Sequence, residues 1–158
     1  MTNFHAKTIA MDLADEHATL ELGHAIGQSL APPAIVYLRG DLGAGKTTLS
    51  RGLLHGLGHS GSVKSPTYTI VEPYLLDAMS VYHFDLYRLG DPEELEYLGL
   101  RDYLEQNALL LFEWPDRGGA YLPPADLLIE LSPIDEGRHA ELTANTPRGL
   151  GVLAHLRL

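Results

Sequence analysis

The stretch of the sequence that decides the fold spans residues 34–57 and reads AIVYLRGDLGAGKTTLSRGLLHGL. Its first part, residues 34–38, is a short continuous apolar run, typical of a parallel strand that is buried on both faces. The glycine-rich segment that follows ends in Gly45-Lys46-Thr47 and meets every fixed position of the GxxxxGK[ST] pattern. A helix is expected from Lys46 or Thr47 to about Leu57. The stretch therefore predicts a strand, a phosphate-binding loop and a helix.

The loop itself, Gly40-Asp41-Leu42-Gly43-Ala44-Gly45, predicts a site for a nucleoside triphosphate. Its small residues let the backbone curl so that successive N–H groups face the phosphates, and the new helix directs its positive end at them. We expect the Lys46 ammonium to reach the β- and γ-phosphates and the Thr47 hydroxyl to bind Mg²⁺. Thr48 follows as a neighbour without an assigned role. A glycine-rich turn that matches by chance is the alternative, and the flanking strand and helix disfavour it.

The segments around this unit predict the rest of the domain. Asp15 is suited to cap a helix with apolar residues at helical spacing as far as Leu30. Short helical pieces are expected from Asp91 through Leu98 and over residues 101–106. Five more segments have the composition of strands: 67–71, 80–84 after a turn at Asp77-Ala78, 108–112, 127–131, and 140–143 after a turn at Gly137. Residues 1–158 are thus expected to form a single P-loop domain of the α/β class, with a mostly parallel central sheet, an antiparallel portion and flanking helices.

Composition excludes several classes of function. The formal net charge of −10, with lysines only at positions 7, 46 and 64, argues against broad, independent contact with nucleic acid. No stretch approaches the roughly 20 apolar residues of a membrane span, and the first residues lack the pattern of a secretory signal, so we expect a cytoplasmic protein. The absence of cysteine excludes disulfides and thiolate metal sites.

Two acidic residues follow predicted strands, Asp85 after residues 80–84 and Glu113 after residues 108–112. In a parallel α/β sheet, ligands bind beyond the carboxyl ends of the strands, which is the edge that carries the phosphate loop. One acid can complete the Mg²⁺ shell while the other orients or activates water, and the pattern does not assign these tasks. For a single acid at a strand end, a solvated residue or a helix cap is an equally good reading.

Four further features remain open on the residues alone. Trp114, the only tryptophan, either stacks on the nucleotide base or covers the core. The segment 65–69 lies where P-loop proteins carry nucleotide-sensing switches, but it also fits an ordinary turn into a strand. His83 is expected to pack in its strand rather than bind a metal, because no second histidine lies at helical or hairpin spacing from it. Arg88 either contacts phosphate, RNA or a partner at this edge, of which we favour RNA or a partner, or pairs with Asp91.

The order of the motifs GDLGAGKTT (40–48), SPTYT (65–69), HFDLYR (83–88) and FEWP (112–115) resembles the TsaE family, also named YjeE, over about residues 15–142. The resemblance implies an ATPase that acts with the TsaB–TsaD heterodimer to form threonylcarbamoyladenosine (t6A) beside the anticodon of tRNAs that read codons beginning with adenine. TsaD would transfer the group from threonylcarbamoyl-AMP made by TsaC, and ATP hydrolysis would sustain turnover. The tRNA would be held mainly through the complex.

The resemblance also implies roles for residues. Lys46, Asp85 and Glu113 would be catalytic, with Thr47 and Glu113 as Mg²⁺ ligands and Asp85 beside the γ-phosphate or the water. The family approaches the nucleotide base from the start of its first helix and from a late hairpin turn, which match Glu16 and Gly137. The residues expected to bind ATP are Glu16, Leu42, Gly43, Ala44, Gly45, Lys46, Thr47, Thr48, Asp85, Trp114 and Gly137. The chain departs from the family mainly at residues 117–120 and at both termini.

Other functions compete with a partner-regulated ATPase. A small-molecule kinase would use the same loop and strand-end acid, although no arginine-rich lid is visible in the sequence. A nucleotide-gated binding module would use ATP to organise residues 65–69 for docking without useful hydrolysis. A GTPase is disfavoured because the chain has no Asn-Lys-x-Asp sequence for reading guanine.

Overall fold

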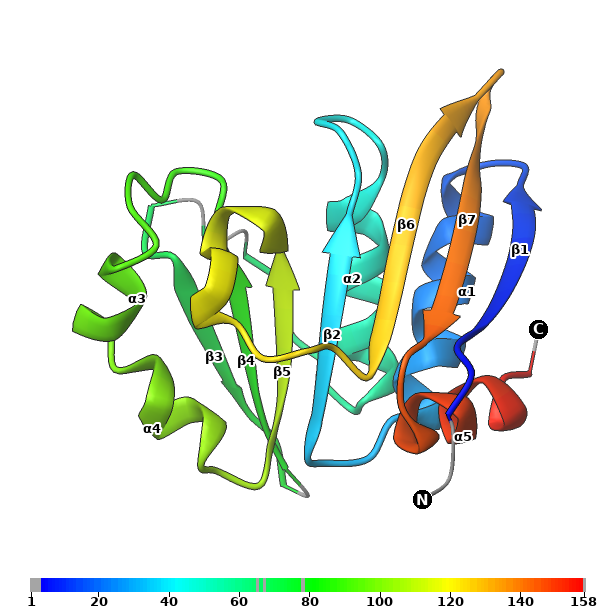
Figure 1. Ribbon diagram of the computed structural model, residues 1–158. Helices are drawn as coiled ribbons and strands as arrows, with labels where there is room; N and C mark the ends of the chain where they lie inside the picture. Colours follow the sequence, from blue (N-terminus) through cyan, green and yellow to red (C-terminus); the bar gives the residue numbers. More distant parts are fainter. Residues whose placement is uncertain (1–3, 65, 67, 78, 158) are drawn as a thin grey trace.

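The computed structural model describes residues 4–64, 66, 68–77 and 79–157, and a mixed β-sheet crosses the whole molecule (Figure 1). In this part of the chain the sheet has seven strands in the order β1-β7-β6-β2-β5-β4-β3. The strands are β1 Lys7–Leu13, β2 Ala34–Arg39, β3 Val71–Leu75, β4 Ser80–Asp85, β5 Ala108–Glu113, β6 Leu127–Ile134 and β7 Gly137–Ala144.

The centre of the sheet is parallel and its margins are antiparallel. β6, β2, β5 and β4 run in one direction, while β7 and β1 on one side and β3 on the other run antiparallel to their neighbours. Every residue of β5 is buried, as expected for a strand covered on both faces. The predicted α/β fold with a mostly parallel sheet and an antiparallel portion is confirmed.

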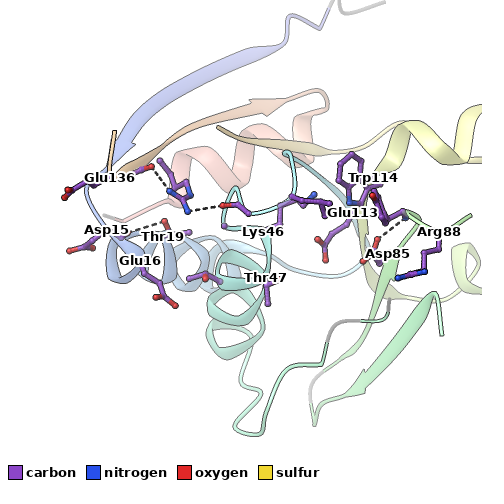
Figure 2. A pocket seen from close by; sticks show the side chains of 17 residues that line it. Asp15, Glu16, Thr19, Lys46, Thr47, Asp85, Arg88, Glu113, Trp114 and Glu136 are labelled. Atoms are coloured by element: carbon purple, nitrogen blue, oxygen red, sulfur yellow. Dashed lines mark hydrogen bonds between the residues drawn. The ribbon is translucent and has the colours of Figure 1, made fainter. Parts of the chain in front are cut away.

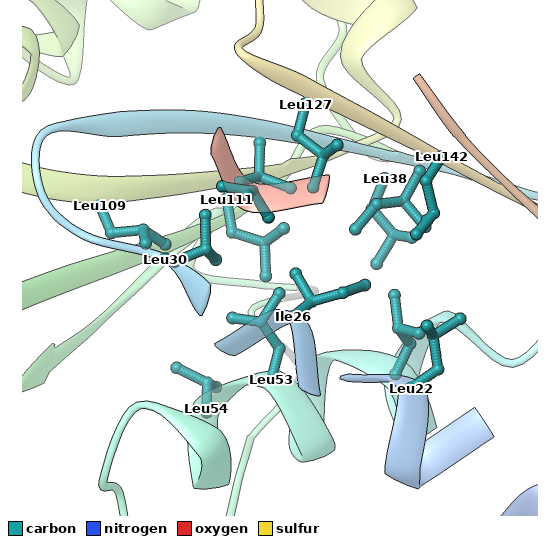
Figure 3. Close-up of a cluster of buried hydrophobic side chains, with 14 of the residues drawn as sticks. Leu22, Ile26, Leu30, Leu38, Leu53, Leu54, Leu109, Leu111, Leu127 and Leu142 are labelled. Carbon is teal, nitrogen blue, oxygen red and sulfur yellow. The ribbon is translucent and has the colours of Figure 1, made fainter. Parts of the chain in front are cut away.

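Helices cover the two faces of this sheet unequally. On one face α1 (Glu16–Ser29) and α2 (Lys46–Gly56) pack against β2, β5 and β6, where Ile26, Leu53 and Leu111 lie in one apolar cluster (Figure 3). On the other face the short helices α3 (Glu94–Tyr97) and α4 (Leu100–Leu104) cover Leu110 and Phe112. A 3-10 segment (Pro115–Tyr121) follows β5, and α5 (Pro147–His155) ends the described fold. None of the helices within the described residues is long and apolar enough to cross a membrane.

The helix α1 begins and packs as its sequence predicts. The Asp15 carboxylate accepts a hydrogen bond from the Ala18 N–H at 2.8 Å, so it caps the helix. On the side facing α2, Gly23 and Gly27 lie so close to that helix that a Cβ at either position would meet backbone oxygen at 2.2 to 2.3 Å. The two helices are therefore in backbone contact, and α1 is held beside the helix that follows the phosphate loop.

The prediction of a strand over residues 67–71 is wrong. Residues 68–70 form a turn rather than a strand, because the Ile70 N–H donates to the Pro66 carbonyl at 2.8 Å and Ile70 has a φ of 68°; β3 begins only at Val71. Thr67 and Ser65 of the same segment, and Ala78 of the predicted turn, lie outside the described residues.

The prediction that Gly137 lies in the hairpin turn is also wrong. It is the first residue of β7 and pairs with Ile134, so the hairpin turn consists of Asp135 and Glu136. Asp135 adopts a φ of 48° in this turn. The sequence also left β1, the 3-10 segment and α5 unpredicted.

Candidate functional site

A pocket of about 670 Å³ opens at the carboxyl ends of the parallel strands β2, β4 and β5 (Figure 2). It lies between the phosphate loop, the start of α1 and the β6–β7 hairpin. The predicted residues that line it are Glu16, Leu42, Gly43, Gly45, Lys46, Thr47, Thr48, Asp85, Glu113, Trp114 and Gly137, together with Arg88. Ala44 is the exception, because its side chain is buried in the core and only its backbone can face a ligand. Segments from five parts of the chain thus meet at one edge of the sheet.

The phosphate loop has the backbone shape that its glycines allow. Gly43 and Gly45 have φ angles of 82° and 103°, a region that other residues rarely adopt. A tight turn, closed by the Ala44 N–H donating to the Asp41 carbonyl at 3.0 Å, brings the chain to the first turn of α2. Gly45 is the N-cap of α2 and has no side chain to cap it, so the first N–H groups of the helix remain donors for an anion.

Lys46 is held at the centre of the pocket with only 7% of its surface exposed. Its ammonium donates to the Gly40 carbonyl and lies 3.8 Å from the centroid of the Trp114 ring. Burial lowers the pKa of Lys46, while the nearby carboxylates of Glu113 and Asp85 act in the opposite direction. The lysine is thus a buried cation placed between the loop and two acids.

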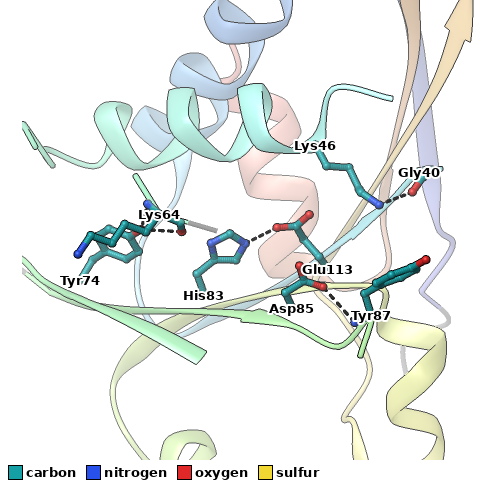
Figure 4. A network of polar contacts seen from close by, with 8 residues as sticks. All are labelled: Gly40, Lys46, Lys64, Tyr74, His83, Asp85, Tyr87 and Glu113. Atoms are coloured by element: carbon teal, nitrogen blue, oxygen red, sulfur yellow. Dashed lines mark hydrogen bonds and ion pairs between the residues drawn. The ribbon is translucent and has the colours of Figure 1, made fainter. Parts of the chain in front are cut away.

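The two acids lie side by side, because Asp85 of β4 pairs with Glu113 of β5 across adjacent parallel strands (Figure 4). They are 8% and 5% exposed. Asp85 Oδ1 accepts from the Tyr87 N–H at 3.0 Å, and Glu113 Oε2 accepts from His83 Nε2 at 2.5 Å. Burial raises the pKa of Asp85, the hydrogen bond from Tyr87 opposes this, and the charge of Glu113 raises the pKa further. A cation in the pocket would therefore favour ionisation of Asp85.

The donor set at this corner fits Mg²⁺. The oxygens of Thr47, Asp85 and Glu113 line one pocket, and hard oxygen donors with one or two carboxylates are what Mg²⁺ takes from proteins when phosphates supply the rest. The glycine-rich turn beside them leaves room for those phosphates, because a Cβ added at Gly43 would meet nothing within 4 Å.

The β6–β7 hairpin supplies pocket residues that the sequence did not predict. Arg138 donates from Nη2 to the Gly43 carbonyl at 3.0 Å, which ties the hairpin to the phosphate loop. Its Nε is buried without a hydrogen-bond partner among the described residues. A Cβ at Gly137 would lie 2.1 Å from the Leu13 carbonyl, so only glycine lets the hairpin approach the end of β1 this closely. The cue in the sequence was the position of Arg138 directly after Gly137.

Other unpredicted lining residues are Asp15 and Thr19 of the α1 start, Tyr87 and Glu136. Their neighbours Glu16 and Arg88 were predicted. The Glu16 carboxylate of α1 lies 3.3 Å from the Arg51 guanidinium of α2. Arg88 is exposed at the rim, with its guanidinium 4.9 Å from the centroid of the Tyr68 ring. His83 packs within β4, as expected, and it also contacts Glu113.

The chain is similar to known proteins over most of its length. The family model described as threonylcarbamoyl adenosine biosynthesis protein TsaE matches residues 13–140. The tRNA threonylcarbamoyladenosine biosynthesis protein TsaE of Haemophilus influenzae is 45% identical over 153 residues, 94% of this chain and 97% of that protein. The protein of the same name from a Nostoc species is 40% identical over 136 residues, 83% of each chain.

A solved structure agrees with these sequence matches. The crystal structure of YdiB from Bacillus subtilis superposes with a TM-score of 0.82 at 27% identity, covering 96% of this chain and 95% of that one. The family match spans most of the chain, and the relatives align over most of their own length. This chain therefore belongs to the TsaE family.

Proposed function

We propose that this protein is a Mg²⁺-dependent ATPase that is required, together with TsaB and TsaD, for t6A modification of the adenosine next to the tRNA anticodon. The observation that carries the proposal is the pocket in which Lys46 and Thr47 of the phosphate loop face Asp85 and Glu113. The names of the relatives, which are tRNA threonylcarbamoyladenosine biosynthesis proteins, support the pathway. We take residues 1–158 as one ATPase domain acting in the cytoplasm.

In this proposal the residues divide the chemistry among them. The backbone N–H groups of residues 42–48 and the Lys46 ammonium bind the phosphates of ATP. Thr47 and Glu113 would hold Mg²⁺, which neutralises charge on the phosphates when bound. Asp85, fixed by the Tyr87 N–H, lies where it can orient water or contact the γ-phosphate. To reach a phosphate, Lys46 has to exchange its contact with the Gly40 carbonyl for a phosphate oxygen.

The base and ribose have a separate part of the pocket. Glu16, at the start of α1, lies away from Asp85 and Glu113 (Figure 2), and Gly137 lines the pocket from the hairpin side. Trp114 already stacks under the Lys46 ammonium, so we assign it to the phosphate end of the pocket rather than to the base. This assignment differs from stacking on the nucleotide base, which is one of the two roles that the sequence left open for Trp114.

The charge of the chain supports dependence on partners. With a net charge of −10, the protein has little means of attracting tRNA phosphates by itself, so we propose that tRNA is bound mainly by TsaB–TsaD. Arg88 lies exposed at the pocket rim, where a partner or the tRNA could reach it. A nucleotide-dependent contact at this rim would link the state of the site to the complex.

The test is ATP hydrolysis and t6A formation measured for the protein alone and with TsaB, TsaD and tRNA. We expect slow hydrolysis alone, stimulation by the complex, and loss of multiple-turnover modification in Glu113→Ala. Glu105→Ala, which removes an exposed acid beyond the end of α4, is the matched control and should behave as wild type. Normal multiple-turnover modification by Glu113→Ala would refute the hydrolytic role, and phosphate transferred to a metabolite instead of released would favour the kinase alternative.

A further inference from the structure

His83 is a buried histidine whose ring contacts one of the two pocket acids. It lies in β4 with 2% of its surface exposed, and its Nε2 is 2.5 Å from Oε2 of Glu113 (Figure 4). Glu113 lines the pocket, whereas His83 is not among the described residues that do so. His83 therefore lies behind Glu113 and contacts this acid, but it does not itself line the pocket.

The chemistry of the pair fixes the direction of the hydrogen bond. An ionised carboxylate has no proton to give, so Nε2 has to carry the hydrogen and donate it to Glu113. The other ring nitrogen, Nδ1, is buried without a hydrogen-bond partner among the described residues. The opposite tautomer would bury an unpaired N–H there and turn a lone pair toward the carboxylate, which is the costlier arrangement. The Nε2–H form is thus the neutral tautomer that the surroundings favour.

This hydrogen bond restricts how Glu113 can present its two oxygens. With Oε2 held by His83, the side chain cannot rotate freely about its last torsion, and Oε1 is the oxygen left for the pocket. A carboxylate that binds a metal through one oxygen is commonly oriented by a hydrogen bond to the other, and loss of such a partner costs about 10- to 100-fold in metal affinity. The pairing of β4 with β5 brings the two side chains to the same face of the sheet, because His83 lies two residues before Asp85.

We propose that His83 is a positioning residue, which orients the Glu113 carboxylate and thereby sets the affinity of the nucleotide-loaded site for the divalent cation. The proposal rests on the proposed function, because it requires Glu113 to be the metal ligand. A histidine that only filled space in β4 would have no effect on metal binding once the fold was intact.

The experiment compares His83→Asn with His83→Gln. Both carry an amide donor, but the glutamine NH₂ falls near the place of imidazole Nε2, whereas the asparagine NH₂ is one methylene too short to reach Glu113. Affinity is read from free Mn²⁺ measured by electron paramagnetic resonance, with the protein saturated with a non-hydrolysable ATP analogue. We expect the dissociation constant for Mn²⁺ to rise about 10- to 100-fold in His83→Asn and to return most of the way in His83→Gln. Binding of the analogue in EDTA should stay unchanged in both.

Two controls separate the possible failures. Glu113→Gln should weaken Mn²⁺ binding; if it does not, Glu113 is no metal ligand and the proposed function loses its metal site, whatever His83 does. If Glu113→Gln weakens binding but His83→Asn binds Mn²⁺ like wild type, or if His83→Gln is as weak as His83→Asn, the positioning role is wrong. Circular dichroism checks folding, and His83→Phe, a flat ring without a donor, replaces His83→Asn should that variant not fold; it is expected to show the same loss.

Discussion

Replacing Gly52 with alanine tests whether α1 and α2 are in backbone contact, on which the shape of the pocket depends. Gly52 lies inside α2, and a Cβ there would be 2.2 Å from the Leu20 carbonyl oxygen of α1, where real Cβ atoms essentially never come closer than 3.0 Å. Alanine improves helix propensity by about 1 kcal/mol over glycine. Overpacking costs about 1 to 3 kcal/mol, and the upper end applies here because a backbone carbonyl cannot rotate away. We therefore expect a net loss of about 2 kcal/mol in the free energy of unfolding.

The matched control is Gly151→Ala. Gly151 lies inside α5, and a Cβ there would meet nothing within 4 Å, so the same substitution should stabilise the protein by up to about 1 kcal/mol. Both variants are measured by urea unfolding followed by circular dichroism. If Gly52→Ala proves as stable as Gly151→Ala, the close packing of the two helices is wrong, and with it our account of how α1 is held beside the phosphate loop.

Three further outcomes follow from single side chains. Leu53→Ala empties a fully buried position of the core and should cost about 2 to 5 kcal/mol in the same unfolding assay. The hydrogen bond with Asp12 raises the pKa of His139. The stabilisation of the fold by the charged His139 should therefore be complete below pH of about 6.5 and disappear as the pH rises through the raised pKa. The melting temperature of His139→Gln should accordingly fall below that of wild type at pH 6 and match it at pH 9. Because the Lys46 ammonium lies over Trp114, ATP should change the tryptophan emission in wild type, whereas Lys46→Ala should show neither this change nor tight binding by calorimetry.

The central unit of the fold could be predicted because its signals are local. The apolar run of β2, the glycine pattern of the loop and the start of α2 follow one another in 24 residues, from 34 to 57. The position of Asp85 and Glu113 could also be predicted, since parallel strands bring their carboxyl ends to one edge. These predictions needed only the type of each element and its direction in the sheet.

The errors have two origins, an unrecognised local turn and pairing between strands that are distant in the sequence. Residues 67–71 have a strand-like composition, yet the described part, 68–70, turns back through the hydrogen bond from Ile70 to Pro66. The edge strand β1 has an alternating pattern at Ile9, Met11 and Leu13 that could have indicated it. No local signal shows that β1 pairs with β7, where Lys7 lies opposite Ala144 across nearly the whole chain.

The same long-range pairing explains why the sequence missed one wall of the pocket. β2 ends at Arg39, opposite Glu130, while β6 continues beyond this point to Ile134 before the chain turns back. The hairpin therefore projects past the end of β2 and rises beside the phosphate loop (Figure 1). Pairing with Leu13 of β1 holds Arg138 there, where it donates to the Gly43 carbonyl. The P-loop motif specifies the phosphate end of the site from 24 adjacent residues, whereas the opposite wall exists only because β1 and β7, from opposite ends of the chain, pair with each other.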